Sequence, residues 1–279
     1  MVRINKYLAS CEIGSRRGVE ELIKNGKVSV NNNIICDLST NIDLEKDIVK
    51  VDGKVVKQNT QKTFIILNKP KGYMVTRKDE FNRKTIYSLL PDFAFNLHPI
   101  GRLDYDSEGL LILTNDGDLT NKLIHPTAKI EKTYKVIVSG KITMEDIERL
   151  RGGVEIDLSP RIDNKVAKPT IKRNIPTPQT PKLYKTNTAK VFLNSASDEK
   201  SEVKITITEG KNRQIRKMVE ALGHEIISLK RLQIGDIKLE KLPVGMWRFL
   251  KDNEILHLLK TKDKRKGDVQ TPKTNKKER

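Results

Sequence analysis

Residues 101–119 read Gly-Arg-Leu-Asp-Tyr-Asp-Ser-Glu-Gly-Leu-Leu-Ile-Leu-Thr-Asn-Asp-Gly-Asp-Leu, and this stretch says more about the fold than any other. It places the carboxylate of Asp104 close in sequence to the guanidinium of Arg102. The apolar run Leu110–Leu113 follows almost at once and is typical of a buried strand. A carboxylate beside a cation on a rigid apolar support suits a reactive side chain better than a solvent-facing one. We therefore take Asp104 as the first candidate catalytic residue.

The sequence around this stretch alternates short β-type runs with two helices. The runs are Phe64 to Leu67, Leu110 to Leu113, Tyr134 to Val138, Ala189 to Leu193 and Val203 to Ile207. Thr143 predicts the N-cap of a helix over Met144–Leu150, and a second helix is predicted over Asn212–Leu222. Strands outnumber helices, so residues 62–258 are expected to form an α+β domain around a mixed, mostly antiparallel sheet.

Residues 1–60 are expected to form a smaller domain of two helices and a few short strands. Ser15 is a candidate N-cap for the second helix, and Asp52-Gly53 predicts the turn of a hairpin. The polar run 59–63 then predicts a linker to the larger domain.

The composition narrows the class of partner. A formal net charge of +18 and a pI of about 9.7 favour a polyanion, with nucleic acid as the first choice. No run approaches the ~18 apolar residues of a membrane-spanning helix, and the N-terminus lacks the apolar core of a signal peptide. Two cysteines cannot frame a disulfide scaffold, and the four histidines are scattered. We expect a cytoplasmic protein with no metal site and no membrane partner.

Two basic segments are expected to lie outside the packed core. Residues 160–181 hold five of the eleven prolines, and residues 161–190 carry eight Lys or Arg against one acid. The sequence therefore predicts a basic, Pro-rich loop over 160–190. Residues 260–279 carry nine Lys or Arg against three acids and predict a basic disordered tail.

The N-terminal sequence resembles the S4 RNA-binding module. The resemblance rests on the order Arg-Ile-Asn-Lys-Tyr-Leu-Ala, then Gly14 to Arg17, then Ile23 to Asn31. Such a module implies a basic helix pair that contacts structured RNA through shape and phosphates. The candidate RNA-binding residues here are Arg3, Lys6, Arg16, Arg17, Lys24 and Lys27.

The stretch around Asp104 resembles the signature of the ribosomal-RNA pseudouridine synthases that carry an S4 domain. The resemblance implies that Asp104 is the catalytic carboxylate, either as a nucleophile at the sugar or as a base on it. A segment similar to Glu131–Val136 carries a base-stacking Tyr in that family, which implies this role for Tyr134.

A third segment, Glu209–Met218, resembles the family motif whose cation pairs with the catalytic Asp. Arg216 is our first choice for that cation and Arg213 the second, because spacing alone leaves both open. Both arginines lie on a predicted basic outer face of the helix, together with Lys217. We also expect Arg102 and Lys217 to contact RNA.

The resemblance implies an enzyme that isomerises a specific uridine to pseudouridine, with no cofactor and no metal. It is closest to the large-subunit rRNA branch, while small-subunit rRNA, another RNA or a non-catalytic rRNA-binding assembly factor stay open as alternatives. The expected partner is structured ribosomal RNA with its target uridine flipped out of the stack, bound by a monomer.

Overall fold

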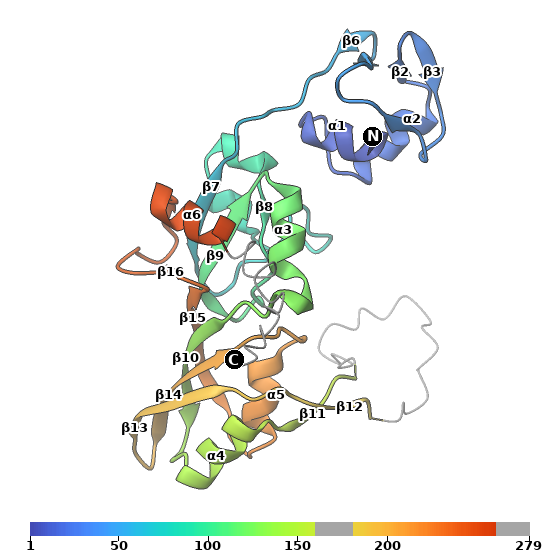
Figure 1. The fold of residues 1–279 in the computed structure, drawn as a ribbon. Helices are drawn as coiled ribbons and strands as arrows, with labels where there is room; N and C mark the ends of the chain where they lie inside the picture. Colours follow the sequence, from blue (N-terminus) through green and yellow to red (C-terminus); the bar gives the residue numbers. More distant parts are fainter. Residues whose placement is uncertain (160–180, 261–279) are drawn as a thin grey trace, which may run out of the picture. The chain divides into compact units, whose positions relative to one another are not determined.

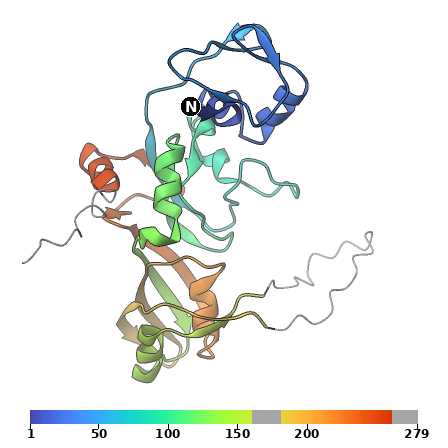
Figure 2. The ribbon, with the colours of Figure 1, turned by 45° about the vertical axis from the view of Figure 1, so that its right-hand side comes forward.

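The computed structural model describes residues 1–159 and 181–260, and the described chain divides into two compact units (Figures 1 and 2). The first unit comprises Met1–Thr63 with the short segments Asn96–His98 and Thr114–Asp116. The rest of the described chain forms the second unit. Each unit has its own apolar core.

The first unit packs two short helices, α1 (Ile4–Ser10) and α2 (Gly18–Lys24), against small sheets. Its strands are β1 (Val2–Arg3), β2 (Val28–Val30), β3 (Asn33–Ile35), β4 (Asn41–Ile42), β5 (Val49–Val51) and β6 (Lys54–Val55). The predicted turn at Asp52-Gly53 is confirmed, since it joins β5 to β6. The predicted N-cap at Ser15 is displaced: α2 begins at Gly18, and the Ser15 hydroxyl accepts a hydrogen bond from the Gly18 N–H at 3.0 Å.

The second unit is built on a mixed sheet, which confirms the predicted α+β class. Within the described residues this sheet has nine strands, in the order β13-β14-β10-β15-β9-β7-β17, with β16 paired to β15 and β8 to β9. The strands are β7 (Phe64–Lys69), β8 (His98–Pro99), β9 (Glu108–Thr114), β10 (Lys132–Ser139), β13 (Lys190–Ala196), β14 (Lys200–Ile207), β15 (Ile226–Ile234), β16 (Ile237–Lys238) and β17 (Trp247–Phe249). Strand β10 pairs antiparallel with β14 and β15, whereas β15 runs parallel to β9.

Helices cover the sheet. Near β9 these are α3 (Gly117–Ile124) and α6 (Asp252–Lys260), whose Leu119, Leu123 and Leu258 share a core with Leu110 and Ile112 of β9. The short 3-10 turns η1 (Ile86–Leu89), η2 (Asp92–Asn96) and η3 (Pro126–Ala128) complete the connections. At the other end of the sheet, α4 (Met144–Gly152) packs on β13, and α5 (Gln214–Glu220) packs on β15.

Helix α4 shows how local sequence sets an element. The Thr143 hydroxyl accepts the Asp146 N–H at 3.1 Å, and the Asp146 carboxylate accepts the Thr143 N–H at 3.0 Å. This reciprocal capping box satisfies two helix-end donors and fixes the start of the helix. The predicted N-cap is therefore confirmed.

The predicted loop 160–190 is wrong at its C-terminal end. The chain forms β12 (Leu183–Lys185), which pairs antiparallel with β11 (Glu155–Asp157), and then enters β13 at Lys190. Residues 160–180 of that loop and residues 261–279 of the predicted tail lie outside the described residues. In the described part of the chain, no helix is long and apolar enough to span a bilayer.

Candidate active site

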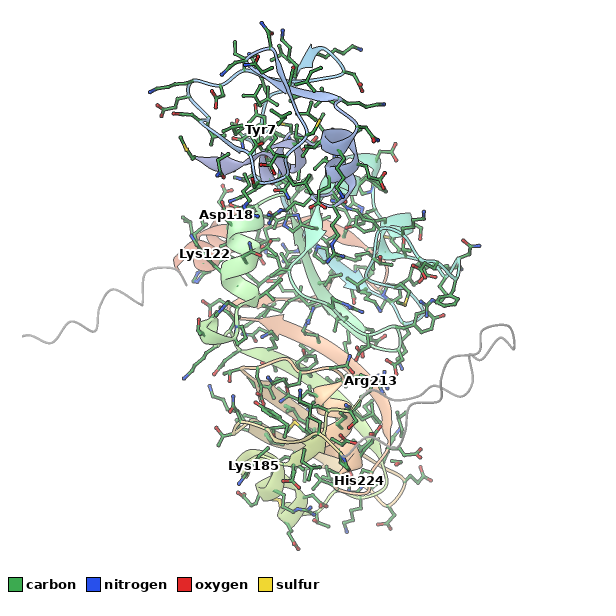
Figure 3. The ribbon with its side chains drawn as sticks, turned by 90° about the vertical axis from the view of Figure 1, so that its right-hand side faces the viewer. Tyr7, Asp118, Lys122, Lys185, Arg213 and His224 are labelled. Atoms are coloured by element: carbon green, nitrogen blue, oxygen red, sulfur yellow. The ribbon has the colours of Figure 1, made fainter. Side chains whose placement is uncertain are left out.

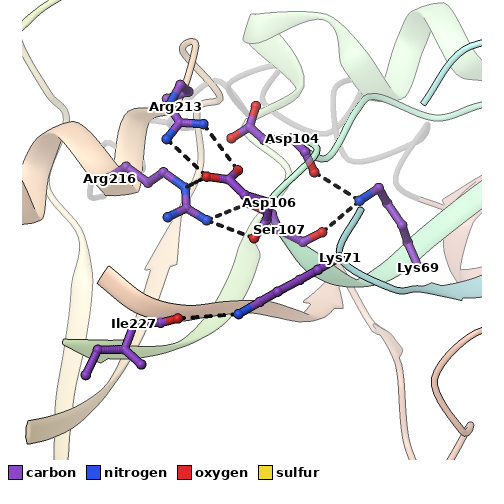
Figure 4. Close-up of polar contacts among 8 residues, drawn as sticks. All are labelled: Lys69, Lys71, Asp104, Asp106, Ser107, Arg213, Arg216 and Ile227. Atoms are coloured by element: carbon purple, nitrogen blue, oxygen red, sulfur yellow. Dashed lines mark hydrogen bonds and ion pairs between the residues drawn. The ribbon is translucent and has the colours of Figure 1, made fainter. Parts of the chain in front are cut away.

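Asp104 lies in the loop that leads into β9, and a buried lysine holds the backbone of this loop. The Nζ atom of Lys69, the last residue of β7, donates to the carbonyl oxygens of Asp104 at 3.0 Å and Ser107 at 2.8 Å (Figure 4). It also donates to the carbonyl oxygen of Pro70 at 3.1 Å. The three N–H bonds of one ammonium group thus meet three carbonyl acceptors. The position of Asp104 is therefore fixed through its backbone, which leaves its carboxylate available.

Burial of Lys69 perturbs its proton affinity. The side chain is fully buried, and this desolvation lowers its pKa from 10.5 to about 8, against the opposing pull of the Asp104 and Asp106 carboxylates. A buried ammonium group is tolerated only where acceptors replace its water shell, and the loop carbonyls do so here. The lysine and the loop therefore depend on each other.

A second buried cation binds the two ends of the same loop. Arg231 of β15 is 3% exposed, and its guanidinium donates to the carbonyl oxygens of Leu110 at 2.8 Å and Arg102 at 3.2 Å. The backbone of Arg231 also passes very close to Gly109, which has a φ of +108°. A Cβ atom on that glycine would lie 2.2 Å from the Arg231 carbonyl oxygen, so the site requires glycine there.

Asp106 is the carboxylate that binds the arginines of α5. The Nη1 and Nη2 atoms of Arg213 donate to its Oδ1 and Oδ2 atoms, each at 3.2 Å, and the Arg216 Nε lies 3.3 Å from Oδ2. Arg216 Nη2 also donates to the Asp106 carbonyl at 3.1 Å and to the Ser107 hydroxyl at 3.3 Å (Figure 4). Arg213 is the N-cap residue directly before α5 and has a left-handed φ of 51°. Figure 3 shows it at that end of the helix, with His224 beyond the other end.

These contacts change the titration of Asp106. Its partial burial acts to raise the pKa of the carboxyl, but the hydrogen bonds from Arg213 and the charges of both arginines outweigh that effect. The pKa of Asp106 is therefore lowered from its ordinary value, and the group is ionised at neutral pH.

The expected ion pair between Arg216 and Asp104 is not the one that the structure forms. Arg216 and Arg213 both pair with Asp106, two residues further along the loop, where the carboxylate faces α5. Among the described residues, the Asp104 carboxylate forms no ion pair. Its charge acts on both arginines more weakly than that of Asp106. As predicted, the arginines of α5 lie beside this loop, but they pair with the Asp106 carboxylate and not with that of Asp104.

The predicted basic outer face of this helix is also wrong in part. Arg216 and Lys217 are each 8% exposed, because α5 lies against both β15 and β11. The Lys217 amine donates to the Asp157 carbonyl of β11 at 2.6 Å. Lys217 therefore serves an internal contact and not an exposed stripe, so we do not retain it among the RNA contacts.

Tyr134 lies on β10 with its side chain in the buried face of the sheet, 8% exposed. Its cross-strand neighbours are Ile205 of β14 and Arg231 of β15. Arg231 in turn binds the carbonyls that flank the Asp104 loop. Tyr134 is thus linked to the loop through one residue.

The candidate RNA contacts of the first unit lie on its surface. Those exposed are Arg3, Lys6, Arg16, Arg17, Lys24 and Lys27. Arg102, next to the Asp104 loop of the second unit, is exposed as well. Within residues 1–159 and 181–260, no group of three or more His, Cys, Asp or Glu side chains is placed to hold a metal ion.

Sequence reasoning missed Lys69 and Arg231 as parts of the site. A signal for Lys69 was present, since the polar pair Asn68-Lys69 follows the apolar run Phe64–Leu67 directly and precedes Pro70. Arg231 gave no comparable signal, because it directly follows Lys230 and its position gives no sign that it is the buried cation of the two.

The fold and the site together define a basic protein whose candidate reactive carboxylate stands on a loop anchored to a mixed sheet. A family model described as RNA pseudouridylate synthase matches residues 63–221, and one for the S4 domain matches residues 2–49. The chain belongs to the RNA pseudouridylate synthase family and carries an S4 domain.

Individual relatives agree with this assignment. An "uncharacterized RNA pseudouridine synthase" of Aquifex aeolicus is 38% identical, over 93% of this chain and 94% of its own length. The "ribosomal large subunit pseudouridine synthase B" of Bacillus subtilis is 35% identical, over 92% of this chain and 96% of its own. A solved pseudouridylate synthase has a TM-score of 0.60 and 27% identity, and covers 92% of this chain and all of its own.

Proposed function

We propose that this protein isomerises a specific uridine to pseudouridine in large-subunit ribosomal RNA. Family membership supports the reaction, and similarity to the large-subunit synthase of Bacillus subtilis supports the substrate. In this reaction the C1′–N1 bond breaks, the uracil turns, and a C1′–C5 bond forms. A proton leaves C5 and N1 is protonated, so the product has the composition of the substrate and no co-reactant is consumed.

Asp104 is the residue that we assign to the reacting sugar, as nucleophile or as base. The observation that carries this assignment is the anchoring of its loop: Lys69 holds the Asp104 carbonyl while the carboxylate itself stays outside the arginine pairs. A side chain held by its backbone with its functional group unengaged is preorganised for a substrate. Tyr134 is assigned to stacking on the flipped uracil and to a part in removing the C5 proton.

The exposed basic residues of the first unit are assigned to RNA binding. They would neutralise phosphates of the substrate, so affinity should fall steeply as salt rises. The target base would then reach the second unit after unstacking, at a cost of a few kcal/mol.

Asp104→Asn is the direct test of the proposed chemistry. The substitution is nearly isosteric and leaves the Lys69 contact to the backbone intact, so the fold and RNA affinity should be retained. We expect pseudouridine formation to be abolished in a tritium-release or mass-spectrometric assay. Asp106→Asn is the matched control and should lower activity without abolishing it, because Asp106 is occupied by two arginines. Turnover by Asp104→Asn above a few per cent of wild type would remove Asp104 from the mechanism.

The substrate is tested by mapping pseudouridine in total rRNA from cells with and without this gene. Loss of one site in large-subunit rRNA is expected. Loss of a site in small-subunit rRNA would reassign the substrate, and an unchanged map with normal RNA binding would favour an assembly factor.

A further inference from the structure

The end of the sheet formed by β13, β14, β10 and β15 has one covered and one uncovered face. In Figures 1 and 2, α4 and α5 lie on one side of these strands. Side chains on the other side contact each other across the strands: the Thr133 and Thr206 hydroxyls lie 2.9 Å apart, and Lys135 Nζ lies 2.6 Å from the Glu202 carboxylate. Phe192 on this side is 53% exposed. We call this surface the lysine face.

Cations line up across the lysine face. The strand register puts Phe192 opposite Lys204, Lys204 opposite Lys135, and Lys135 opposite Lys230. Adjacent strands lie about 4.8 Å apart, so three lysines fall within roughly 10 Å. Like charges directly opposite one another destabilise a sheet. Two carboxylates offset part of this repulsion: Glu202 lies 2.6 Å from Lys135 Nζ, and Glu108 is opposite Lys230 in the strand register.

An aromatic ring accompanies the charges. Lys204 Nζ lies over the Phe192 ring at 5.1 Å from its centroid, and β13 is the outer strand of the sheet. An exposed aromatic ring beside lysines on an antiparallel sheet combines a stacking platform with phosphate neutralisation, the two elements of single-strand recognition.

We propose that the lysine face binds a single-stranded RNA segment, with phosphates on Lys204 and Lys230 and a base on Phe192, while Lys135 keeps its ion pair with Glu202. The proposal rests on the proposed function in that it takes RNA as the polyanion. Charge complementarity favours RNA over a second copy of this chain, whose face would carry the same charges. Charge complementarity also disfavours residues 261–279 of this chain as the occupant, because they hold eight Lys or Arg against three acids.

The lysine face lies on the side of the sheet opposite α5, although Lys230 is paired in register with Glu108, the first residue of β9 after the Asp104 loop. Side chains alternate along a strand, so Lys135 points away from the face that carries Tyr134. The arginines that bind Asp106 come from α5, which packs on that opposite face. RNA bound to the lysine face should therefore add affinity and leave the chemical step unchanged.

The test compares Lys204→Gln/Lys230→Gln and Phe192→Ala with a charge-matched control, Lys122→Gln/Lys241→Gln, whose lysines are exposed outside the lysine face. Binding of a single-stranded RNA oligomer is measured at several salt concentrations, with the thermal midpoint of each variant recorded. We expect the slope of log affinity against log salt to become shallower by about 1.4 in the double variant, because each lysine–phosphate pair on a single strand accounts for ~0.7 of the slope. Phe192→Ala should weaken binding about 10-fold, within the range for one stacked base. The control should keep the slope of wild type or lose less than half as much.

Turnover at saturating RNA should be unchanged in both variants of the lysine face. A double variant with the slope and affinity of the control overturns the proposal. If wild-type protein binds the oligomer but forms no pseudouridine in ribosomal RNA, the proposed function fails while the lysine face is still judged by binding alone.

Discussion

Lys69 shows how a single residue ties the core to the site. Its ammonium group has three donors, and all three are used by carbonyls at or next to the reactive loop. Deprotonation would leave two donors for three acceptors, and one carbonyl would lose its partner. The position of the Asp104 backbone thus depends on the charge of a residue that is fully buried.

The pKa of Lys69, lowered to about 8, predicts a loss of activity as the pH rises through that value. The effect on global stability has the opposite sign. Between about pH 8 and the ordinary pKa of 10.5, the unfolded chain holds a proton that the folded chain has released, so the contribution of Lys69 to stability increases with pH. A pH–rate profile measured together with urea unfolding should show these two trends diverge.

Lys69→Met is the matching variant. It removes the donors but keeps much of the apolar stem, so we expect a folded protein whose turnover is roughly 10- to 100-fold lower, the scale of a loop displaced by about 1 Å. Its remaining activity should lack the alkaline decline near pH 8. A variant with wild-type turnover would show that the loop keeps its position without this lysine.

At the scale of elements, α5 is joined to the Asp104 loop by Asp106. Because the pKa of Asp106 is lowered, its pairs stabilise the fold above its ordinary value of 3.8, and that stability is lost as the pH falls through the lowered pKa. The contact therefore holds across the neutral range. It positions the helix against the loop by two guanidinium groups from adjacent turns.

Double-mutant cycles will identify the carboxylate on which the arginines act. Arg213→Ala and Arg216→Ala, each combined with Asp106→Asn, should show coupling of roughly 0.5–3 kcal/mol in urea unfolding, as expected for groups in direct contact. The same arginine variants combined with Asp104→Asn should be close to additive. Coupling to Asp104 and additivity with Asp106 would restore the pairing that the sequence resemblance implied.

The sequence predicted elements whose signals are local. Thr143 and Asp146 form their capping box within four residues, and the turn at Asp52-Gly53 needs only its own backbone preferences. The burial of Arg216 and Lys217 was not predictable, because it arises from β11, which lies far away in the sequence. The choice between Asp104 and Asp106 likewise depends on tertiary geometry, which a separation of two residues does not reveal.

At the scale of the whole molecule, each of the two units has an apolar cluster of its own, and the two clusters share no residue among those described. The first contains Ile4, Leu8 and Val28, and the second contains Leu110 and Ile112. Residues assigned to the reaction belong to the second unit, while the exposed basic helices belong to the first.

Deletion of residues 1–60 should therefore separate binding from chemistry. The remaining chain should fold with a cooperative thermal transition, because its core is intact, and should bind structured rRNA more weakly with a shallower salt dependence. Turnover at saturating RNA should persist at a reduced level. Equal affinity and an equal salt slope in the truncated protein would show that the first unit does not bind this RNA.

The pairing of β9 with β15 has a mechanical consequence. Its register covers Lys230 with Glu108 and Arg231 with Gly109, whereas β10 pairs with β14 along the whole of Lys132–Ser139. The pairing of β9 with β15 is thus the short junction in this sheet. Asp104 leads into β9 on one side of the junction, and Tyr134 lies on β10, which pairs with β15 on the other side. The Arg231 guanidinium reaches across this junction, donates to the Arg102 and Leu110 carbonyls and so holds β15 and β9 together. Arg231→Met should speed amide hydrogen exchange at residues 108–110 far more than at residues 134–138. This result would show that separation of β9 from β15 sets the distance between Asp104 and Tyr134.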